Sequence, residues 1–123
     1  MTIRTNTVTK LEWVLRIGVF GTFIGHGVLA ISVNPLWVSY LALFGLTLPQ
    51  ISVIMPVIGS LDIIVAVIIL LKPNKYILLW AVFWAFATAA IRPISGEDIW
   101  SFVERAANWA VPLALYFYRK DKK

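Results

Sequence analysis

Hydrophobic residues fill four long stretches of this chain, and prolines and charged residues separate them. The stretches cover residues 11–31, 51–71, 76–91 and 101–119. A helix needs about 20 mostly apolar residues to cross the hydrocarbon core of a bilayer. Because the runs approach this length and leave little chain between them, we predict a single integral membrane domain over residues 1–123. The predicted fold class is all-α, a transmembrane four-helix bundle.

The first stretch, residues 11–31, carries small and polar residues on separate faces of its predicted helix. At about 100° per residue, Gly18, Gly21 and Gly25 fall on one side, where the backbone of a neighbouring helix could come close. A second face carries polar groups, namely Glu12, Arg16, Thr22 and His26. Such groups point into protein or water rather than into lipid. The first helix is therefore predicted to border a polar interior.

A shorter apolar run over residues 36–48 is too short to cross a bilayer. Pro35 suits the first turn of a new helix. Trp37 and Tyr40, near the start of the run, are residue types typical of the membrane–water interface. We therefore predict a short interfacial helix between spans one and two, which lies at the outer interface or against the bundle and is ended by Pro49.

The last stretch depends on two charged residues for its length. Ser101 followed by Glu104 fits a capping box, and Ser95 is an equally suitable earlier start. The uninterrupted apolar part that follows is too short to span a membrane alone. A spanning helix over 101–119 must therefore take Glu104 and Arg105 into the outer part of the membrane.

Composition agrees with this pattern, since 60% of the 123 residues are hydrophobic and the mean hydropathy is +0.84. The net charge of +5 comes from basic residues near the ends of the apolar runs, a distribution that argues against nucleic-acid binding. Lys and Arg favour the cytoplasmic side of a membrane. Those that set the orientation are Arg4, Lys10, Arg16, Lys72, Lys75, Arg119, Lys120, Lys122 and Lys123. We predict a multi-pass protein of the plasma membrane with both termini in the cytoplasm.

Missing residue types narrow the chemistry. The sequence has no cysteine, which excludes disulfides, thiolate metal sites and cysteine-ligated iron–sulfur clusters. Its single histidine, His26, cannot supply two axial haem ligands. We expect no covalent cofactor and no metal site, and the sequence leaves open whether the protein is an enzyme.

Arg16 and Asp62 are charged residues inside the first and second spans. With about 1.5 Å of rise per residue, Arg16 lies about 8 Å and Asp62 about 14 Å above the inner boundary, a difference that an arginine side chain can close. An isolated charge in hydrocarbon costs at least about 3 kcal/mol. We therefore predict an intramembrane ion pair between them, which either contributes to function or only fixes the register of the helices.

Polar residues from three spans share a similar depth near the outer side and predict a ligand pocket there. The candidates are His26, Trp84, Arg92, Glu104, Arg105, Asn108 and Trp109. Histidine is the side chain whose ordinary pKa lies nearest neutrality, so His26 could exchange a proton with a quinone oxygen or a small acid. Trp84 and Trp109 lie deep enough to stack on a flat ligand. The alternative is a set of helix caps, ion pairs and interfacial aromatic residues without a site.

The first two spans carry three short features: the Arg16-x-Gly18 start, the Gly25-His26-Gly27 motif and the acidic Asp62. Together with the four-span layout and its short intervening helix, they resemble the DoxX-like family of small bacterial membrane proteins. The resemblance covers nearly the whole chain. Members of that family include a subunit associated with thiosulfate:quinone oxidoreduction. The resemblance implies a location in the bacterial plasma (inner) membrane and a link to quinone or sulfur redox chemistry.

Three functions are consistent with these features. The first is an accessory subunit that contacts quinone or lipid in a membrane oxidoreductase system, with His26 exchanging a proton and Arg92 or Arg105 holding an oxygen. The second is a structural or assembly partner, either a homo-oligomer or a subunit of a larger membrane complex. The third is a small proton-coupled carrier with Asp62, Arg16 and His26 along its path at different depths. The first predicts a ligand-sized pocket, the second no cavity, and the third a polar path to the cytoplasmic side.

Overall fold

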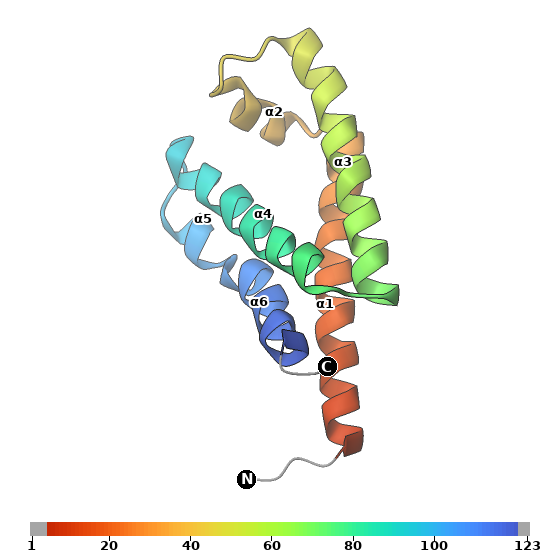
Figure 1. Ribbon diagram of the computed structural model, residues 1–123. Helices are drawn as coiled ribbons and strands as arrows, with labels where there is room; N and C mark the ends of the chain where they lie inside the picture. The colour runs from red at the N-terminus through yellow and green to blue at the C-terminus, as the bar shows by residue number, and fades with distance from the viewer. Residues whose placement is uncertain (1–4, 121–123) are drawn as a thin grey trace.

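The computed structural model describes residues 5–120, and the elements in this range are helices (Figure 1). They are α1 (Thr5–Ile31), α2 (Pro35–Ala42), α3 (Leu48–Leu71), α4 (Lys75–Ile94), α5 (Trp100–Val103) and α6 (Ala106–Lys120). Of the helices in the described part of the chain, α1, α3 and α4 are long and apolar enough to cross a membrane. The all-α prediction is confirmed. The predicted C-terminal ends of the first two spans coincide with those of α1 and α3, whereas the helices begin six and three residues earlier than the predicted spans.

The start of α2 is fixed by local chemistry. The side-chain oxygen of Asn34 accepts a hydrogen bond from the backbone N–H of Leu36, 3.0 Å away. Pro35 occupies the first turn, where its missing N–H has no helical partner to lose, and this prediction is confirmed. The helix ends at Ala42, six residues before the predicted end. Gly45 has a φ of +79°, a left-handed conformation that favours glycine and turns the chain toward α3.

A capping box determines where α3 begins. The backbone N–H of Thr47 donates to Oε1 of Gln50 at 2.9 Å, and the N–H of Gln50 donates to Oγ1 of Thr47 at 3.4 Å. Pro49 therefore lies in the first turn of α3. The prediction that Pro49 ends the preceding helix is wrong, because a proline at a helix start gives up no hydrogen bond.

The continuous helix predicted for residues 101–119 is wrong, because the structure divides it at Glu104 and Arg105. Backbone bonds tighten to the i→i+3 pattern here, from Arg105 to Phe102 at 3.2 Å and from Asn108 to Arg105 at 3.0 Å. The predicted capping box also fails, because the N-cap residue of α5 is Ile99, and the backbone N–H of Trp100 donates to Oδ1 of Asp98 at 3.4 Å. Ser101 instead donates to the carbonyl of Asp98 at 2.7 Å. The remaining helix, α6, has 15 residues.

The helices pack as two antiparallel pairs (Figure 1). One pair is α1 with α3 and the other is α4 with α6, and α6 also packs on α1 to join the pairs. The shared core includes Phe23 of α1, Ile69 of α3, Ala85 of α4 and Leu115 of α6. The short helix α2 packs on α3 at the end of the molecule farthest from the start of α1.

Two glycines bring α1 and α3 into backbone contact. A Cβ added to Gly27 would lie 2.8 Å from the carbonyl oxygen of Gly59, and a Cβ on Gly59 would lie 2.5 Å from that of Gly27. Of the predicted glycine face of α1, Gly18 lies against another helix, since a Cβ there would be 3.4 Å from Cγ1 of Val111 on α6. Gly21 and Gly25 are exposed, and a Cβ at either position would meet no atom of the described chain within 4 Å.

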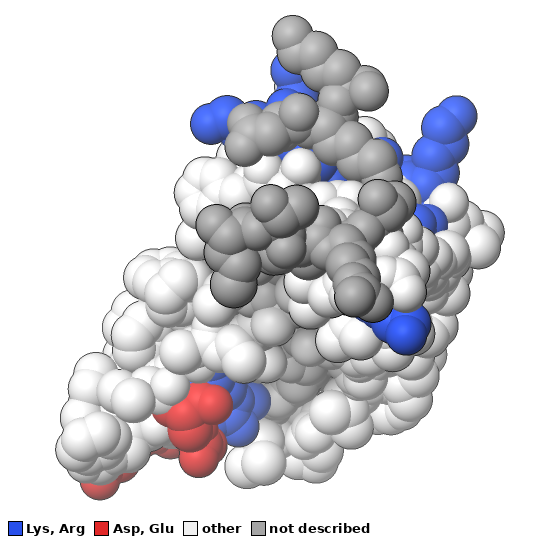
Figure 2. All heavy atoms as spheres, turned by 90° about the horizontal axis from the view of Figure 1, so that it is seen from below, with Lys and Arg blue, Asp and Glu red and all other residues white. Residues whose placement is uncertain are grey.

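Charge is distributed unevenly over the surface. Figure 2 views the molecule from the end where α1 begins and α6 ends, and Lys and Arg gather on this end. The exposed basic residues of this end are Lys10, Lys72, Lys75 and Lys120. The exposed carboxylates lie at the opposite end of the molecule, Glu97 and Asp98 in the α4–α5 loop and Glu104 directly after α5. Arg4, Lys122 and Lys123, which also entered the orientation prediction, lie outside the described residues.

Candidate functional site

A cavity of about 170 Å³ lies between α1, α2, α3 and α4. Its lining is mainly apolar and aromatic, with a histidine, a carboxyl group and two guanidinium groups among the polar residues. The lining residues are His26, Ala30, Trp37, Tyr40, Leu41, Phe44, Met55, Ile58, Asp62, Trp84, Ala87, Thr88, Ile91, Arg92 and Arg105. An apolar cavity of similar size, about 150 Å³, is known to hold benzene. The cavity is therefore large enough for one ring or a short alkyl chain.

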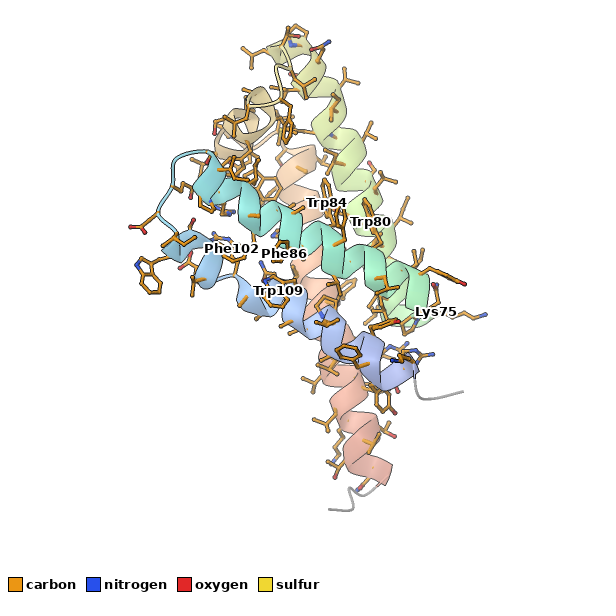
Figure 3. All side chains as sticks on the ribbon, turned by 60° about the vertical axis from the view of Figure 1, so that its left-hand side comes forward. Lys75, Trp80, Trp84, Phe86, Phe102 and Trp109 are labelled. Carbon is orange, nitrogen blue, oxygen red and sulfur yellow. The ribbon has the colours of Figure 1, made fainter. Side chains whose placement is uncertain are left out.

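One end of the cavity, the Asp62 end, holds a buried carboxyl group. Asp62 of α3 is 3% exposed. It accepts a hydrogen bond from the indole of Trp84 on α4. Trp84 in turn stacks on Trp80, with 5.5 Å between ring centroids and an interplanar angle of 12° (Figure 3). A neutral donor, rather than a cation, thus holds this carboxyl group in place.

His26 faces the same cavity from α1. Its ring meets the edge of Trp37 of α2, with centroids 5.4 Å apart and the planes at 84°. The residue is half-buried. An aromatic neighbour orients an imidazole without occupying its nitrogen atoms, so the ring keeps its capacity to exchange a proton or accept a hydrogen bond.

The opposite end, the α2 end, is organised around Tyr40. The Tyr40 hydroxyl donates to Glu97 and accepts a hydrogen bond from Nη1 of Arg92 at 3.1 Å. Burial, and then the hydrogen bond to Glu97, raise the pKa of the Tyr40 phenol above its ordinary value. The phenol therefore stays protonated at neutral pH and can keep both bonds. These bonds fasten α2 to the end of α4.

The two guanidinium groups at the α2 end have unequal partners. Arg105 donates to Glu104 at 2.6 Å and to the carbonyl of Ser101 at 2.8 Å. Arg92 lies 3.8 Å from Glu97, a longer ion pair. Within residues 5–120, the Nε of Arg92 is buried without a hydrogen-bond partner. Arg92 therefore has a donor that the surrounding protein does not use.

The structure brings together only part of the predicted pocket. His26, Trp84, Arg92 and Arg105 line the cavity, whereas Glu104, Asn108 and Trp109 do not. Glu104 is exposed. Asn108 and Trp109 belong to α6, which packs on the face of α4 turned away from the cavity.

Trp109 marks that other face. Its ring meets Phe86 edge-on at 5.8 Å, and Phe86 also meets Phe102 at 5.4 Å. Figure 3 shows these three rings between α4 and the α5–α6 segment, with Trp84 on the other side of α4. Trp84 and Trp109 therefore cannot stack on the same ligand. Depth and helical periodicity predicted one polar face over residues 101–112, but the break between α5 and α6 changes the rotation of α6 about its axis.

The predicted ion pair between Arg16 and Asp62 is wrong for these two described residues. The Arg16 guanidinium donates to the carbonyl of Ile69 at 3.4 Å and to that of Leu70. Those carbonyls lie seven and eight residues beyond Asp62, about 11 Å along α3. The two helices are offset by more than the prediction assumed, so the arginine meets the end of α3 instead of its middle.

Arg16 belongs to a separate group of charges, which we call the inner cluster, in the first half of α1 and near the C-terminal ends of α3 and α6. Glu12 lies 4.0 Å from Arg16 and also accepts a hydrogen bond from Arg119 of α6. Arg16 packs over the ring of Trp13, with 4.0 Å from the guanidinium carbon to the ring centroid. Glu12 and Arg16 are buried, and the cluster joins three helices through one carboxylate, two guanidinium groups and the backbone carbonyls of α3.

Several lining residues of α2 and the following loop were not predicted as part of the site. Trp37, Tyr40, Leu41 and Phe44 all face the cavity. Their spacing of three and four residues places them on one side of a helix, a signal present in the sequence. The prediction of α2 as interfacial left open whether this side faced lipid or protein.

Comparison with known protein families, curated proteins and solved structures found no match to this chain. The fold and site define the class of protein at a coarser level. Over residues 5–120 the protein is all-helical, three of the helices in this range are long and apolar enough to cross a membrane, and a cavity with a mixed polar and aromatic lining lies between the helices.

Proposed function

We propose that this chain is a multi-pass membrane protein with four crossings and a short interfacial helix, α2. Three crossings would be α1, α3 and α4, which have the required length and hydropathy. The fourth would be α5 and α6 together, which run back along α4 over residues 100–120 (Figure 1). A segment of that length rises about 30 Å if helical, close to the thickness of the hydrocarbon core.

The proposed orientation has both termini in the cytoplasm of a bacterial cell. The exposed lysines gather at the end where α1 begins and α6 ends (Figure 2). The exposed carboxylates lie at the other end, in the α4–α5 loop and directly after α5. This asymmetry follows the positive-inside rule. A reporter that works only in the cytoplasm should be active when it is fused after Lys123. Activity only of a reporter that works outside the membrane would overturn the orientation.

We further propose that the protein is an accessory subunit that binds a quinone or a lipid in a membrane oxidoreductase system. The observation that carries this proposal is the cavity itself, which has an apolar body of ring size and donors at its α2 end. His26 would exchange a proton with the ligand, Arg92 and Arg105 would hold its oxygen, and Trp84 would form a wall. The resemblance to the DoxX-like family supports the link to quinone chemistry.

The two other functions fit these observations less well. A proton-coupled carrier needs a polar path from the cavity to the cytoplasmic side, but Arg16 is engaged with Glu12 and the end of α3. An assembly partner needs no ligand cavity. It becomes the preferred function if the cavity proves empty in the purified protein, with a second copy or another membrane subunit as the partner.

Native mass spectrometry of the gently solubilised protein is the direct test. A retained quinone or lipid, lost from a variant in which Ala87→Trp fills the cavity, supports the proposal. Leu79→Trp provides the control, because Leu79 is exposed on the same helix and does not line the cavity. A protein that carries a partner chain but no small molecule would favour the assembly function.

A further inference from the structure

The cavity has an unbalanced charge pattern at its α2 end. Arg92 and Arg105 line it, whereas their partners Glu97 and Glu104 lie outside it and are 39% and 67% exposed at the side chain. Exposed ion pairs contribute little, because water screens them. Asp62 supplies the carboxylate among the described lining residues, and it lies at the opposite end of the cavity from the two arginines. The cavity side of the two guanidinium groups is therefore short of negative charge.

Arg92 also has a hydrogen-bond donor that could bind a negatively charged group in the cavity. Its Nη1 is shared between Tyr40 and Glu97, and its buried Nε has no acceptor within the described chain. A buried donor without an acceptor is unfavourable, and a ligand oxygen would remove that cost. The planar fork of a guanidinium group fits the paired oxygens of a carboxylate or a phosphate better than a single carbonyl oxygen.

The rest of the cavity suits an apolar body. Between Arg92 and Asp62 the wall is formed by hydrocarbon and aromatic side chains, including Ala30, Met55, Ile58, Ala87 and Ile91. Trp84 and Arg92 are eight residues apart on α4, about 12 Å of helix rise. The volume of about 170 Å³ limits the enclosed body to one ring or a short alkyl segment.

We infer that the ligand of this cavity is an amphiphile with an anionic head, a carboxylate or a phosphate, bound by Arg92 and Arg105 with its apolar body directed toward Asp62. The negative charge of Asp62, when present, would keep the head at the α2 end by repulsion. This inference rests on the proposed function, because it names the ligand class of the same cavity. Free fatty acids and anionic phospholipids both carry such a head, and the experiment separates the two sources.

The test compares octanoate with its neutral methyl ester, two probes with the same apolar body. Binding is measured by calorimetry on the full chain in phosphatidylcholine nanodiscs, where no anionic lipid competes. Octanoate should bind at least about tenfold more tightly than methyl octanoate. Adding phosphatidylglycerol to the nanodiscs should weaken octanoate binding if phospholipid is the natural source, and should leave it unchanged if a free acid is.

Two variants separate recognition of the head from general effects on the fold. Arg92→Gln should weaken octanoate binding by roughly 10- to 100-fold, because it removes a charge-assisted bond. Glu97→Gln should strengthen it by about two- to fivefold, because it removes the anion that competes for Arg92. Lys75→Gln, an exposed cation at the far end of α4, is the control and should leave binding unchanged. If Arg92→Gln does not fold, Glu97→Gln decides.

The inference is overturned if methyl octanoate binds as tightly as octanoate, or if Glu97→Gln fails to strengthen octanoate binding. A neutral quinone such as decylubiquinone that binds where octanoate does not would overturn it while leaving the proposed function intact. If neither probe binds and no lipid is retained, both proposals fail together.

Discussion

The inner cluster and the α2 end of the cavity both contain arginines and carboxylates, but they differ in how fully the guanidinium groups are paired. In the inner cluster, Glu12 lies between Arg16 and Arg119, and Arg16 also caps carbonyls at the end of α3. At the α2 end, the guanidinium of Arg92 has a buried Nε without a partner among the described residues. Its ion pair with Glu97 is long and exposed.

This contrast separates charges that hold helices together from charges available to a ligand. Buried charges are tolerated when each one meets an opposite charge or a backbone acceptor, and removing one partner is then costly. Unused donors beside a cavity destabilise the protein slightly, and they persist where a bound molecule satisfies them. We therefore expect substitutions in the inner cluster to affect folding, and substitutions around the cavity to affect binding.

The largest effect on stability is expected from Glu12→Gln. This change leaves Arg16 and Arg119 without their shared carboxylate in a buried position, and should lower the free energy of unfolding by about 3 kcal/mol. Denaturation in detergent measures it, with Glu104→Gln at the exposed α2 end as the matched control. Equal losses for the two variants would remove the distinction between the two regions.

A smaller loss, about 2 kcal/mol, is expected from Gly59→Ala, because the new methyl group would meet the backbone of α1. Gly25→Ala on the open side of α1 should instead stabilise the protein by up to about 1 kcal/mol through helix propensity. Unfolding of the two variants under the same conditions is the measurement. A tolerated Gly59→Ala would show that the α1–α3 contact does not set the position of the cavity walls.

Tyr40→Phe should cost about 1 kcal/mol, since it removes the hydroxyl that links Arg92 to Glu97. Because the pKa of Tyr40 is raised in the folded protein, its contribution is present at neutral pH and is lost as the pH rises above the ordinary value of 10.0. Unfolding measured at pH 8 and again above the ordinary phenol pKa tests this. Tyr76→Phe, at an exposed position, should show no loss at pH 8.

His26→Leu should leave the free energy of unfolding within about 1 kcal/mol, because the contact it loses is an aromatic edge to Trp37. Retention of the ligand in native mass spectrometry should nevertheless disappear. A variant that unfolds, or one that keeps its ligand, would contradict a binding role for His26. Unfolding would favour the assembly-partner function.

The smallest effect is the coupling between Arg16 and Asp62, which should be close to zero. A double-mutant cycle with Arg16→Met and Asp62→Asn should give additive changes within about 0.5 kcal/mol, because the residues share no contact. A coupling well above that value would restore the direct ion pair between the first two spans.

Local signals in the sequence predicted the C-terminal ends of the first two spans and the start of α2. The chain leaves α1 after Ile31 and α3 after Leu71, and Pro35 opens α2 as expected. Caps and prolines act within one helical turn, so a short window contains the whole interaction. The prediction failed where a residue fits two local structures. Pro49 could end one helix or begin the next, and the chain at Glu104 and Arg105 could continue a helix or interrupt it.

The sequence by itself determined that the protein is helical and apolar enough for a membrane, and that His26, Arg92 and Arg105 would need polar surroundings. Tertiary structure decided their partners. The contact of Gly27 with Gly59 sets the offset between α1 and α3. This offset places Arg16 beside the end of α3, so that Trp84 and not Arg16 is the hydrogen-bond partner of Asp62. Offset and rotation depend on how side chains far apart in sequence fit against each other, and no periodicity within one helix contains that information.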